Sequence, residues 1–117
     1  MTRRTERINE LLREEISELV RREMKDPRLG GLITITEVDV SPDLRSAKVY
    51  VSVMGSDEEK ASTFKALGAA AHFLQREIRH RITIRRMPEL HFLRDDSMEK
   101  GARILELLDK AHDETAG

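Results

Sequence analysis

The sequence predicts a single α+β domain in which helices pack on one face of a three-stranded sheet. Three observations support this class. Two neighbouring runs between residues 32 and 54 show strand alternation, apolar residues recur with helical spacing on both sides of them, and a shorter alternating run lies near residue 90. A chain of 117 residues suits one core and has no room for a second. We therefore expect residues 1–111 to form the domain and residues 112–117 a short polar tail.

Composition narrows the class of protein further. The chain has no Cys, which excludes a disulfide framework and any thiolate metal site. Charged residues near the N-terminus stand where a signal peptide needs its apolar core, and no apolar run approaches the roughly 20 residues of a membrane span. These features favour a cytoplasmic protein with no membrane contact.

A first helix is predicted from Arg4 to about Met24. Its apolar residues lie three or four positions apart and form one stripe along the helix. They are Ile8, Leu11, Leu12, Ile16, Leu19, Val20 and Met24. Most other positions are Arg or Glu, often as opposite charges three or four residues apart, which is typical of a solvated outer face. Residues 26–31 contain Pro27 and two Gly and are expected to end the helix and redirect the chain.

The two runs between residues 32 and 54 predict an antiparallel hairpin with one buried face. In the first run, the apolar phase set by Ile33 and Ile35 changes across Glu37, and a bulge near Glu37 would restore it. Ser, Pro and Asp at residues 41–43 favour a turn. The second run alternates apolar with polar residues. The apolar set is Ala47, Val49, Val51 and Val53, and the solvent-facing set is Ser46, Lys48, Tyr50 and Ser52.

Helical spacing resumes after Met54, with Ser56 or Asp57 as the expected N-cap. Residues 68–71 read Gly-Ala-Ala-Ala, and four small side chains in a row permit a bend or a close backbone approach. We therefore predict either two helices or one kinked helix. The apolar positions of this region are Phe64, Leu67, Ala70 or Ala71, Leu74 and Ile78.

A third strand and a last helix complete the predicted order. Leu90 and Phe92 alternate with polar neighbours after Pro88, which is tolerated at the start of a strand. Asp96 or Ser97 is the expected N-cap of the last helix. The apolar positions of that helix are Ile104, Leu105, Leu107 and Leu108.

Catalysis receives little support from the residues. The best candidate cluster is His91 with Asp95 and Asp96, but the His is predicted on the solvent-facing side of a strand and the two Asp where a helix cap is needed. No phosphate-binding loop, nucleophile elbow or metalloprotease motif occurs. We expect a protein without enzymatic activity, cofactor, metal or small-molecule substrate.

The charge distribution instead indicates a binding surface. Residues 76–86 contain five Arg and one acidic residue, Glu77, which gives this segment an excess of four positive charges. Residues 95–117 contain seven acidic and three basic residues, which gives an excess of four negative charges. Clustered Arg suits contacts with phosphates, although a basic helix end also complements the helix dipole. Because Tyr50 is the only aromatic residue expected on a solvent-facing strand side, a base-stacking sheet is disfavoured. The RNA-binding candidates are Arg76, Arg79, His80, Arg81, Arg85 and Arg86.

Four separated blocks together resemble the ribosome-binding factor A family. These blocks are residues 25–30, residues 41–44 with 47–52, residues 88–92, and residues 95–97 with 101–104, and the resemblance extends from about residue 7 to 108. It implies a type II KH-like domain, ordered α-β-β-α-α-β with a C-terminal helix. It also implies a monomeric assembly factor that binds free or immature 30S subunits through 16S rRNA and assists late 30S maturation and 16S rRNA processing, including in the cold.

The resemblance also implies a helix kink in place of the Gly-x-x-Gly loop by which KH domains usually hold nucleic acid. The family has Ala-x-Gly at the kink, and the matching positions here are Ala70, Ala71 and His72, with His72 where Gly is expected. Gly68 is then a candidate to share the role of that Gly. Plain helix packing also explains Ala70 and Ala71. A protein–protein interaction module that uses the charged first helix or the acidic last helix, with only incidental RNA contact, is the alternative function.

Overall fold

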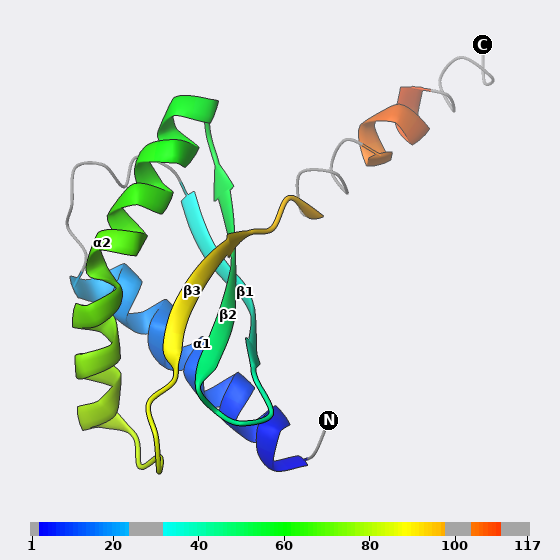
Figure 1. Cartoon of the computed structure of the whole chain (residues 1–117). Helices are drawn as coiled ribbons and strands as arrows, with labels where there is room; N and C mark the ends of the chain where they lie inside the picture. Colours follow the sequence, from blue (N-terminus) through cyan, green and yellow to red (C-terminus); the bar gives the residue numbers. More distant parts are fainter. Residues whose placement is uncertain (1–2, 24–31, 98–103, 111–117) are drawn as a thin grey trace.

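The structure is a computed structural model that describes residues 3–23, 32–97 and 104–110. Helices α1 and α2 pack on the same face of one sheet (Figure 1), which confirms the α+β prediction. The elements are α1 (Arg3–Glu23), β1 (Leu32–Val40), β2 (Ser46–Met54), α2 (Asp57–Arg81) and β3 (Glu89–Arg94), and residues 104–110 are also helical. The predicted turn at residues 26–31 and the predicted tail at residues 112–117 lie outside the described residues. The domain boundary therefore stays a prediction.

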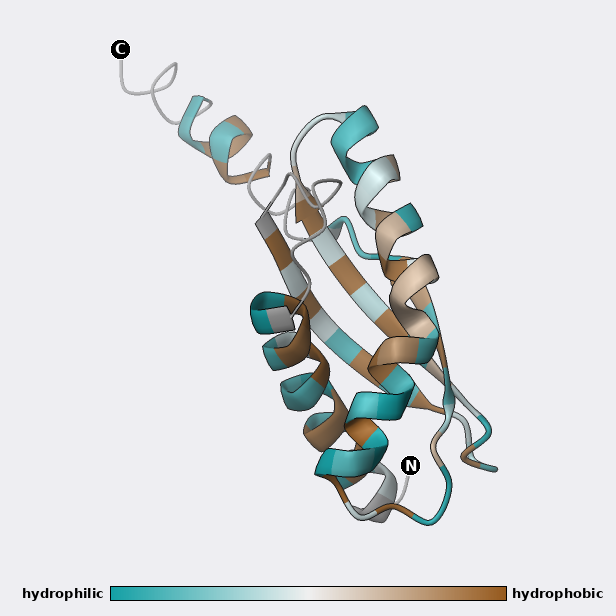
Figure 2. Ribbon diagram, turned by 90° about the vertical axis from the view of Figure 1, so that its left-hand side faces the viewer, coloured by the Kyte–Doolittle hydropathy of each residue, from teal (hydrophilic) through white to brown (hydrophobic). Residues whose placement is uncertain are grey.

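The sheet has the strand order β1-β2-β3 and is mixed. β1 pairs antiparallel with β2, so the predicted hairpin is confirmed, and its register shifts between Ile35 and Glu37, which confirms the predicted bulge. β3 pairs in parallel with β2, because α2 carries the chain back across the sheet before β3 begins. Figure 2 shows the alternation of apolar and polar residues along the strands.

Local hydrogen bonds define the turn of the hairpin. Ser41 Oγ donates to Asp43 Oδ1 at 2.6 Å, and the backbone N of Arg45 donates to the same oxygen at 3.1 Å. The bond from Ser41 lowers the pKa of the Asp43 carboxyl, and the Arg45 amide adds to this effect. Leu44 takes a φ of 60° to complete the turn, and its side chain packs against the core.

The core lies between the sheet and the two helices. The apolar stripe of α1 contributes Leu12, Ile16, Leu19 and Val20, and the alternating set of β2 is buried as predicted. From α2, Leu67, Leu74 and Ile78 complete this core, and the three Phe side chains pack against it while partly buried. The predicted apolar faces are thus confirmed for these residues, whereas Leu11 of the predicted stripe is 37% exposed and Met24 lies outside the described residues.

One expected position in β2 was wrong. Ser52 was predicted on the solvent-facing side of the strand, but only 2% of it is exposed. Ser52 lies opposite Thr34 of β1, and on its other side the backbone N of Asp95 donates to Val51 O at 2.8 Å. The small Ser52 side chain points away from the helices, but it is covered by β1 on one side and by the chain after β3 on the other.

Helix α2 begins with a capping box and runs without a break. Ser56 is its N-cap: Ser56 Oγ accepts from the Glu59 backbone N at 3.1 Å, and Glu59 Oε1 accepts from the Ser56 backbone N at 3.3 Å. Of the two predicted alternatives, one helix rather than two is therefore present. Figure 1 shows that this helix bends near its middle. Within the described residues, neither long helix has the apolar composition that crossing a membrane requires.

Candidate nucleic-acid interface

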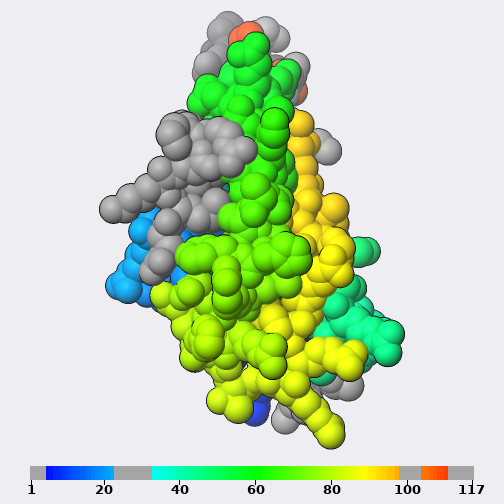
Figure 3. All heavy atoms as spheres, turned by 60° about the vertical axis from the view of Figure 1, so that its left-hand side comes forward, coloured from blue at the N-terminus to red at the C-terminus, as the bar shows by residue number. Residues whose placement is uncertain are grey.

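The predicted RNA-binding residues gather at one end of the molecule. Arg76, Arg79, His80 and Arg81 occupy the last turns of α2, and Arg85 and Arg86 follow in the segment that leads to β3; all six are exposed. Figure 3 shows this end of α2 and the following segment as one continuous surface. The side chains of the last helical turn are also placed to interact with the negative end of the helix dipole.

Arg81 differs from the other candidates because it faces a carboxylate of the first helix. Its Nη1 lies 3.8 Å from Glu15 Oε2, and the exposed fraction is 30% for the Arg81 side chain and 23% for the Glu15 side chain. The pair therefore joins the end of α2 to the middle of α1. By contrast, no ion pair or hydrogen bond links the side chains of Arg76, Arg79, Arg85 or Arg86 to other residues that the structure describes. These four guanidinium groups are available for an anionic ligand.

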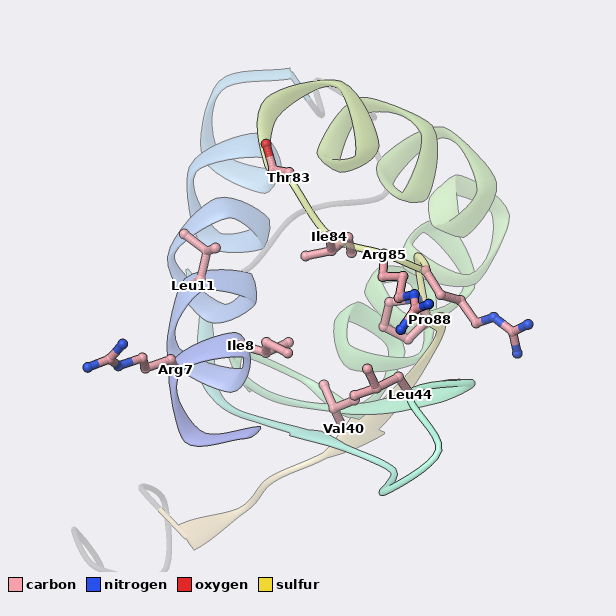
Figure 4. Close-up of a pocket in the computed structure, with 10 residues that line it drawn as sticks. Arg7, Ile8, Leu11, Val40, Leu44, Thr83, Ile84, Arg85 and Pro88 are labelled. Atoms are coloured by element: carbon pink, nitrogen blue, oxygen red, sulfur yellow. The ribbon is translucent and has the colours of Figure 1, made fainter. Parts of the chain in front are cut away.

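A pocket of about 400 Å³ adjoins Arg85 and Arg86 (Figure 4). Its lining is mostly apolar and also includes Thr83 and three Arg. The apolar lining comes from Ile8 and Leu11 of α1, Val40 of β1, Leu44 in the hairpin turn, and Ile84 and Pro88. The three Arg are Arg7, Arg85 and Arg86. In Figure 4 the Arg7 side chain extends away from the pocket, whereas Ile8 and Ile84 point toward each other across it.

Two side-chain amides hold the elements that surround this pocket. Asn9 Oδ1 accepts from the backbone N of Val40 at 2.9 Å, which ties the start of α1 to the end of β1. Gln75 Oε1 accepts from the backbone N of Leu90 at 3.2 Å, which ties α2 to the start of β3. The second bond thereby joins the two elements that flank the segment between α2 and β3.

Sequence reasoning identified only Arg85 and Arg86 among the residues that line the pocket. The apolar lining residues come from four separate segments of the chain. The sequence predicts Ile8 and Leu11 on the apolar stripe of the first helix, and the turn gives no reason to expect an inward-facing Leu44. No local pattern marks these residues as one site, because they come together only in the folded chain.

The predicted kink residues lie on the part of α2 that is only partly covered. Gly68 and His72 are exposed, and Ala70 and Ala71 are partly buried. A Cβ atom built at Gly68 would meet no atom within 4 Å, so packing does not require Gly there. The assignment of these four residues to a functional kink remains a prediction.

Replacing Gly68 with Ala should stabilise the fold. Gly in the interior of a helix costs about 0.5 to 1 kcal/mol relative to Ala, and the space beside Gly68 is open. We expect Gly68→Ala to raise the free energy of unfolding by about that amount in a urea titration. Gly55→Ala is the matched control and should destabilise, because Gly55 has a φ of 149° and a Cβ there would lie 3.1 Å from Glu59 Oε2. A loss of stability in Gly68→Ala would mean that the bend in α2 depends on Gly68.

The two Asp side chains of the candidate cluster His91, Asp95 and Asp96 form hydrogen bonds with neighbouring residues. His91 is exposed on the open face of the sheet. Asp95 Oδ2 accepts from Thr36 Oγ1 at 2.7 Å and Asp95 Oδ1 from the backbone N of Ser97 at 2.9 Å, whereas Asp96 pairs with Arg94 at 2.9 Å. The prediction that Asp96 or Ser97 caps the last helix stays a prediction, because residues 98–103 lie outside the described residues.

The described ranges contain no group of three His, Cys, Asp or Glu side chains that could hold a metal ion. Because both Asp side chains of the cluster are already engaged, their hydrogen bonds stabilise the segment that follows β3.

Comparison with known proteins decides the family. A sequence model described as ribosome-binding factor A matches residues 4–108. This chain belongs to the ribosome-binding factor A family. The family member from Acetivibrio thermocellus is 52% identical over 114 residues, which cover 97% of this chain and 93% of that protein. The member from Dictyoglomus thermophilum is 50% identical over 108 residues, which cover 92% of this chain and 90% of that protein.

Solved structures of the family share the fold. The crystal structure of ribosome-binding factor A from Thermus thermophilus aligns with a TM-score of 0.68 at 29% identity and covers 77% of this chain and 94% of that one. A homology model of the Thermus thermophilus protein, fitted into a cryo-electron microscopy map of its complex with 30S, aligns with a TM-score of 0.61 at 30% identity, covering 74% of this chain and 89% of that one. Members of this family therefore share the architecture described above.

Proposed function

We propose that this chain binds free or immature small ribosomal subunits through 16S rRNA and assists late 30S maturation. Membership of the ribosome-binding factor A family supports the ribosomal partner, as does the fit of a Thermus thermophilus relative into a 30S complex. The observation that carries the RNA contact is the group of exposed Arg side chains at the end of α2 that no described carboxylate neutralises. Such a group supplies both charge and planar donors for phosphates.

Binding by this surface needs no chemical step. The guanidinium groups of Arg76, Arg79, Arg85 and Arg86 bind phosphate oxygens, with His80 beside them, while Arg81 keeps the end of α2 against α1. The bend in α2 lets the exposed helix follow the RNA backbone. In this proposal the protein is a cytoplasmic monomer without enzymatic activity. It stabilises a conformation of immature 16S rRNA from which processing proceeds, and this matters most in the cold, where RNA refolds slowly.

A second candidate function is protein binding through the last helix. Ile104, Leu105, Leu107 and Leu108 are each between 57% and 65% exposed, which leaves one apolar side of this helix open. A ribosomal protein or another assembly factor could cover that side. This function depends on apolar contacts and predicts a weak response to salt, whereas phosphate contacts predict a strong one.

Subunit choice tests the proposal directly. We expect the chain to sediment with free or immature small subunits and to be largely absent from large subunits and translating ribosomes. Sucrose-gradient fractions from one cell extract, probed for the protein, measure this distribution. Equal recovery with large subunits would contradict the proposal, and recovery with small subunits that is insensitive to salt would favour the last helix as the contact.

A further inference from the structure

The pocket beside Arg85 and Arg86 has the composition of a ligand site. Its interior is formed by aliphatic side chains, chiefly Ile8, Val40, Leu44 and Ile84, and none of its lining residues is acidic (Figure 4). No residue from the middle of α2 contributes to it. It is therefore separate from the bend to which the family resemblance assigns the RNA backbone.

The Arg side chains that line the pocket have no counter-ion among the residues that the structure describes. Arg7, Arg85 and Arg86 form no ion pair or hydrogen bond within the part of the chain that the structure describes. Elsewhere in that part, several Arg side chains do pair with a carboxylate. These are Arg13, Arg22, Arg45, Arg81 and Arg94. An apolar pocket whose lining includes unpaired Arg side chains suits a ligand that has an apolar face and an anionic edge.

The size of the pocket limits the ligand. About 400 Å³ lies near the lower end of the range of small-molecule sites, roughly 300 to 1,000 Å³, and is too small to enclose a helix about 10 to 12 Å wide. We propose that this pocket takes one unstacked nucleotide of RNA, with the base against Ile8 and Ile84 and its phosphates on Arg85 and Arg86. The inference rests on the proposed RNA binding and adds a recognition site for a single base.

The chemistry of the two halves of the site is complementary. A nucleobase removed from its stack presents two flat apolar faces, which aliphatic side chains cover without hydrogen bonds, and the guanidinium plane of Arg85 offers a further surface for stacking. The adjoining phosphates are anionic, and bidentate Arg contacts fix their position. Of the described residues that line the pocket, Thr83 is the one with a hydroxyl, a group that can hydrogen-bond to a base edge or to a 2′-hydroxyl.

Two RNA pentamers of equal charge test this site. One carries a single central adenine between four abasic residues, and the other is wholly abasic. In NMR titrations of the full chain, we expect the adenine pentamer to bind about 5- to 10-fold more tightly, at the lower end of what stacking of one base contributes. The additional shifts should fall on the amides of Leu44, Thr83 and Ile84.

Variants separate the base from the phosphates. Ile84→Asn should remove the preference for the adenine pentamer and leave the affinity for the abasic pentamer unchanged within about twofold, because only the apolar interior changes. Arg76→Ala is the matched control: it removes an exposed charge outside the pocket and should weaken both pentamers by the same factor. Circular dichroism confirms that both variants fold.

Three results would overturn the inference. The first is an affinity ratio near one for the unmodified chain, and the second is an unchanged ratio in folded Ile84→Asn. The third is a shift of the pocket amides in Leu105→Asp, Leu108→Asp without RNA, since this would mean that the last helix of the chain occupies the pocket. If the unmodified chain still sediments with small subunits, any of these three results contradicts the proposed base site but not the proposed function. If the unmodified chain does not sediment with small subunits, the proposed function itself is contradicted.

Discussion

Replacing Arg85 and Arg86 together with Ala should flatten the salt dependence of small-subunit binding by about 1.4 in the slope of log K against log salt. Each phosphate contact on single-stranded RNA contributes about 0.7 to that slope, and a duplex would raise the figure to about 1.8 for the pair. If the variant and the unmodified chain bind equally well at 1 M salt, a slope change of 1.4 makes the variant bind about 25-fold more weakly at 0.1 M salt. Both side chains are exposed, so the fold should not change.

The control for this pair removes the same charge from another surface. Arg13 and Arg22 lie on α1 and pair with Glu10 and Glu18, and Arg13 lowers the pKa of the Glu10 carboxyl by its hydrogen bond. Changing both to Ala should leave the slope almost unaltered. The measurement is sedimentation or fluorescence binding to purified small subunits from 50 to 400 mM salt. An unchanged slope in the variant that lacks Arg85 and Arg86 would mean that the subunit does not bind at the end of α2.

Replacing Leu67 with Ala should remove a large part of the stability of the domain. Leu67 is fully buried in α2, where it packs into the core between the helices and the sheet. A buried Leu→Ala change costs about 2 to 5 kcal/mol, through lost burial and the cavity that remains. Domains of this size are stable by about 5 to 15 kcal/mol, so the variant should unfold at clearly lower urea concentration.

Leu105→Ala is the matched control, because it makes the same Leu-to-Ala change at an exposed position. Leu105 is 65% exposed, and its truncation should change the free energy of unfolding by no more than about 0.5 kcal/mol. Equilibrium urea unfolding followed by circular dichroism compares the two variants. Similar losses in both would mean that the last helix packs as tightly as α2 in solution. If instead Leu67→Ala were neutral, the face of α2 that meets the sheet would be assigned incorrectly.

The strands and their buried faces follow from local patterns. The alternation of Val49, Val51 and Val53 with polar residues requires one buried side, since a strand has a period of two. The phase change at Glu37 indicated the bulge for the same reason. The capping box of Ser56 and Glu59 depends on residues three apart, so it too can be read along the chain. Such features involve neighbours in sequence, and a sequence displays them.

Four blocks of residues also carried the family resemblance, and the basic segment stood out by its charge alone. By itself, then, the sequence determined the fold class, the hairpin with its bulge and the surface where RNA is proposed to bind. Whether the small residues of α2 would separate two helices or bend one was left open. Packing against the sheet decided that point, because a single long helix keeps Leu67, Leu74 and Ile78 on the core.

Only the tertiary structure decided the features that join distant segments. The burial of Ser52 depends on β1 and on the chain after β3, and the role of Arg81 depends on Glu15, more than sixty residues before it. The pocket requires α1, the end of β1, the hairpin turn and the segment before β3 to meet, and Leu44 lines it from a turn position at which its φ is 60°. Periodicity records which face of an element is buried, but not which residues of other elements cover it. That information exists only once the chain has folded.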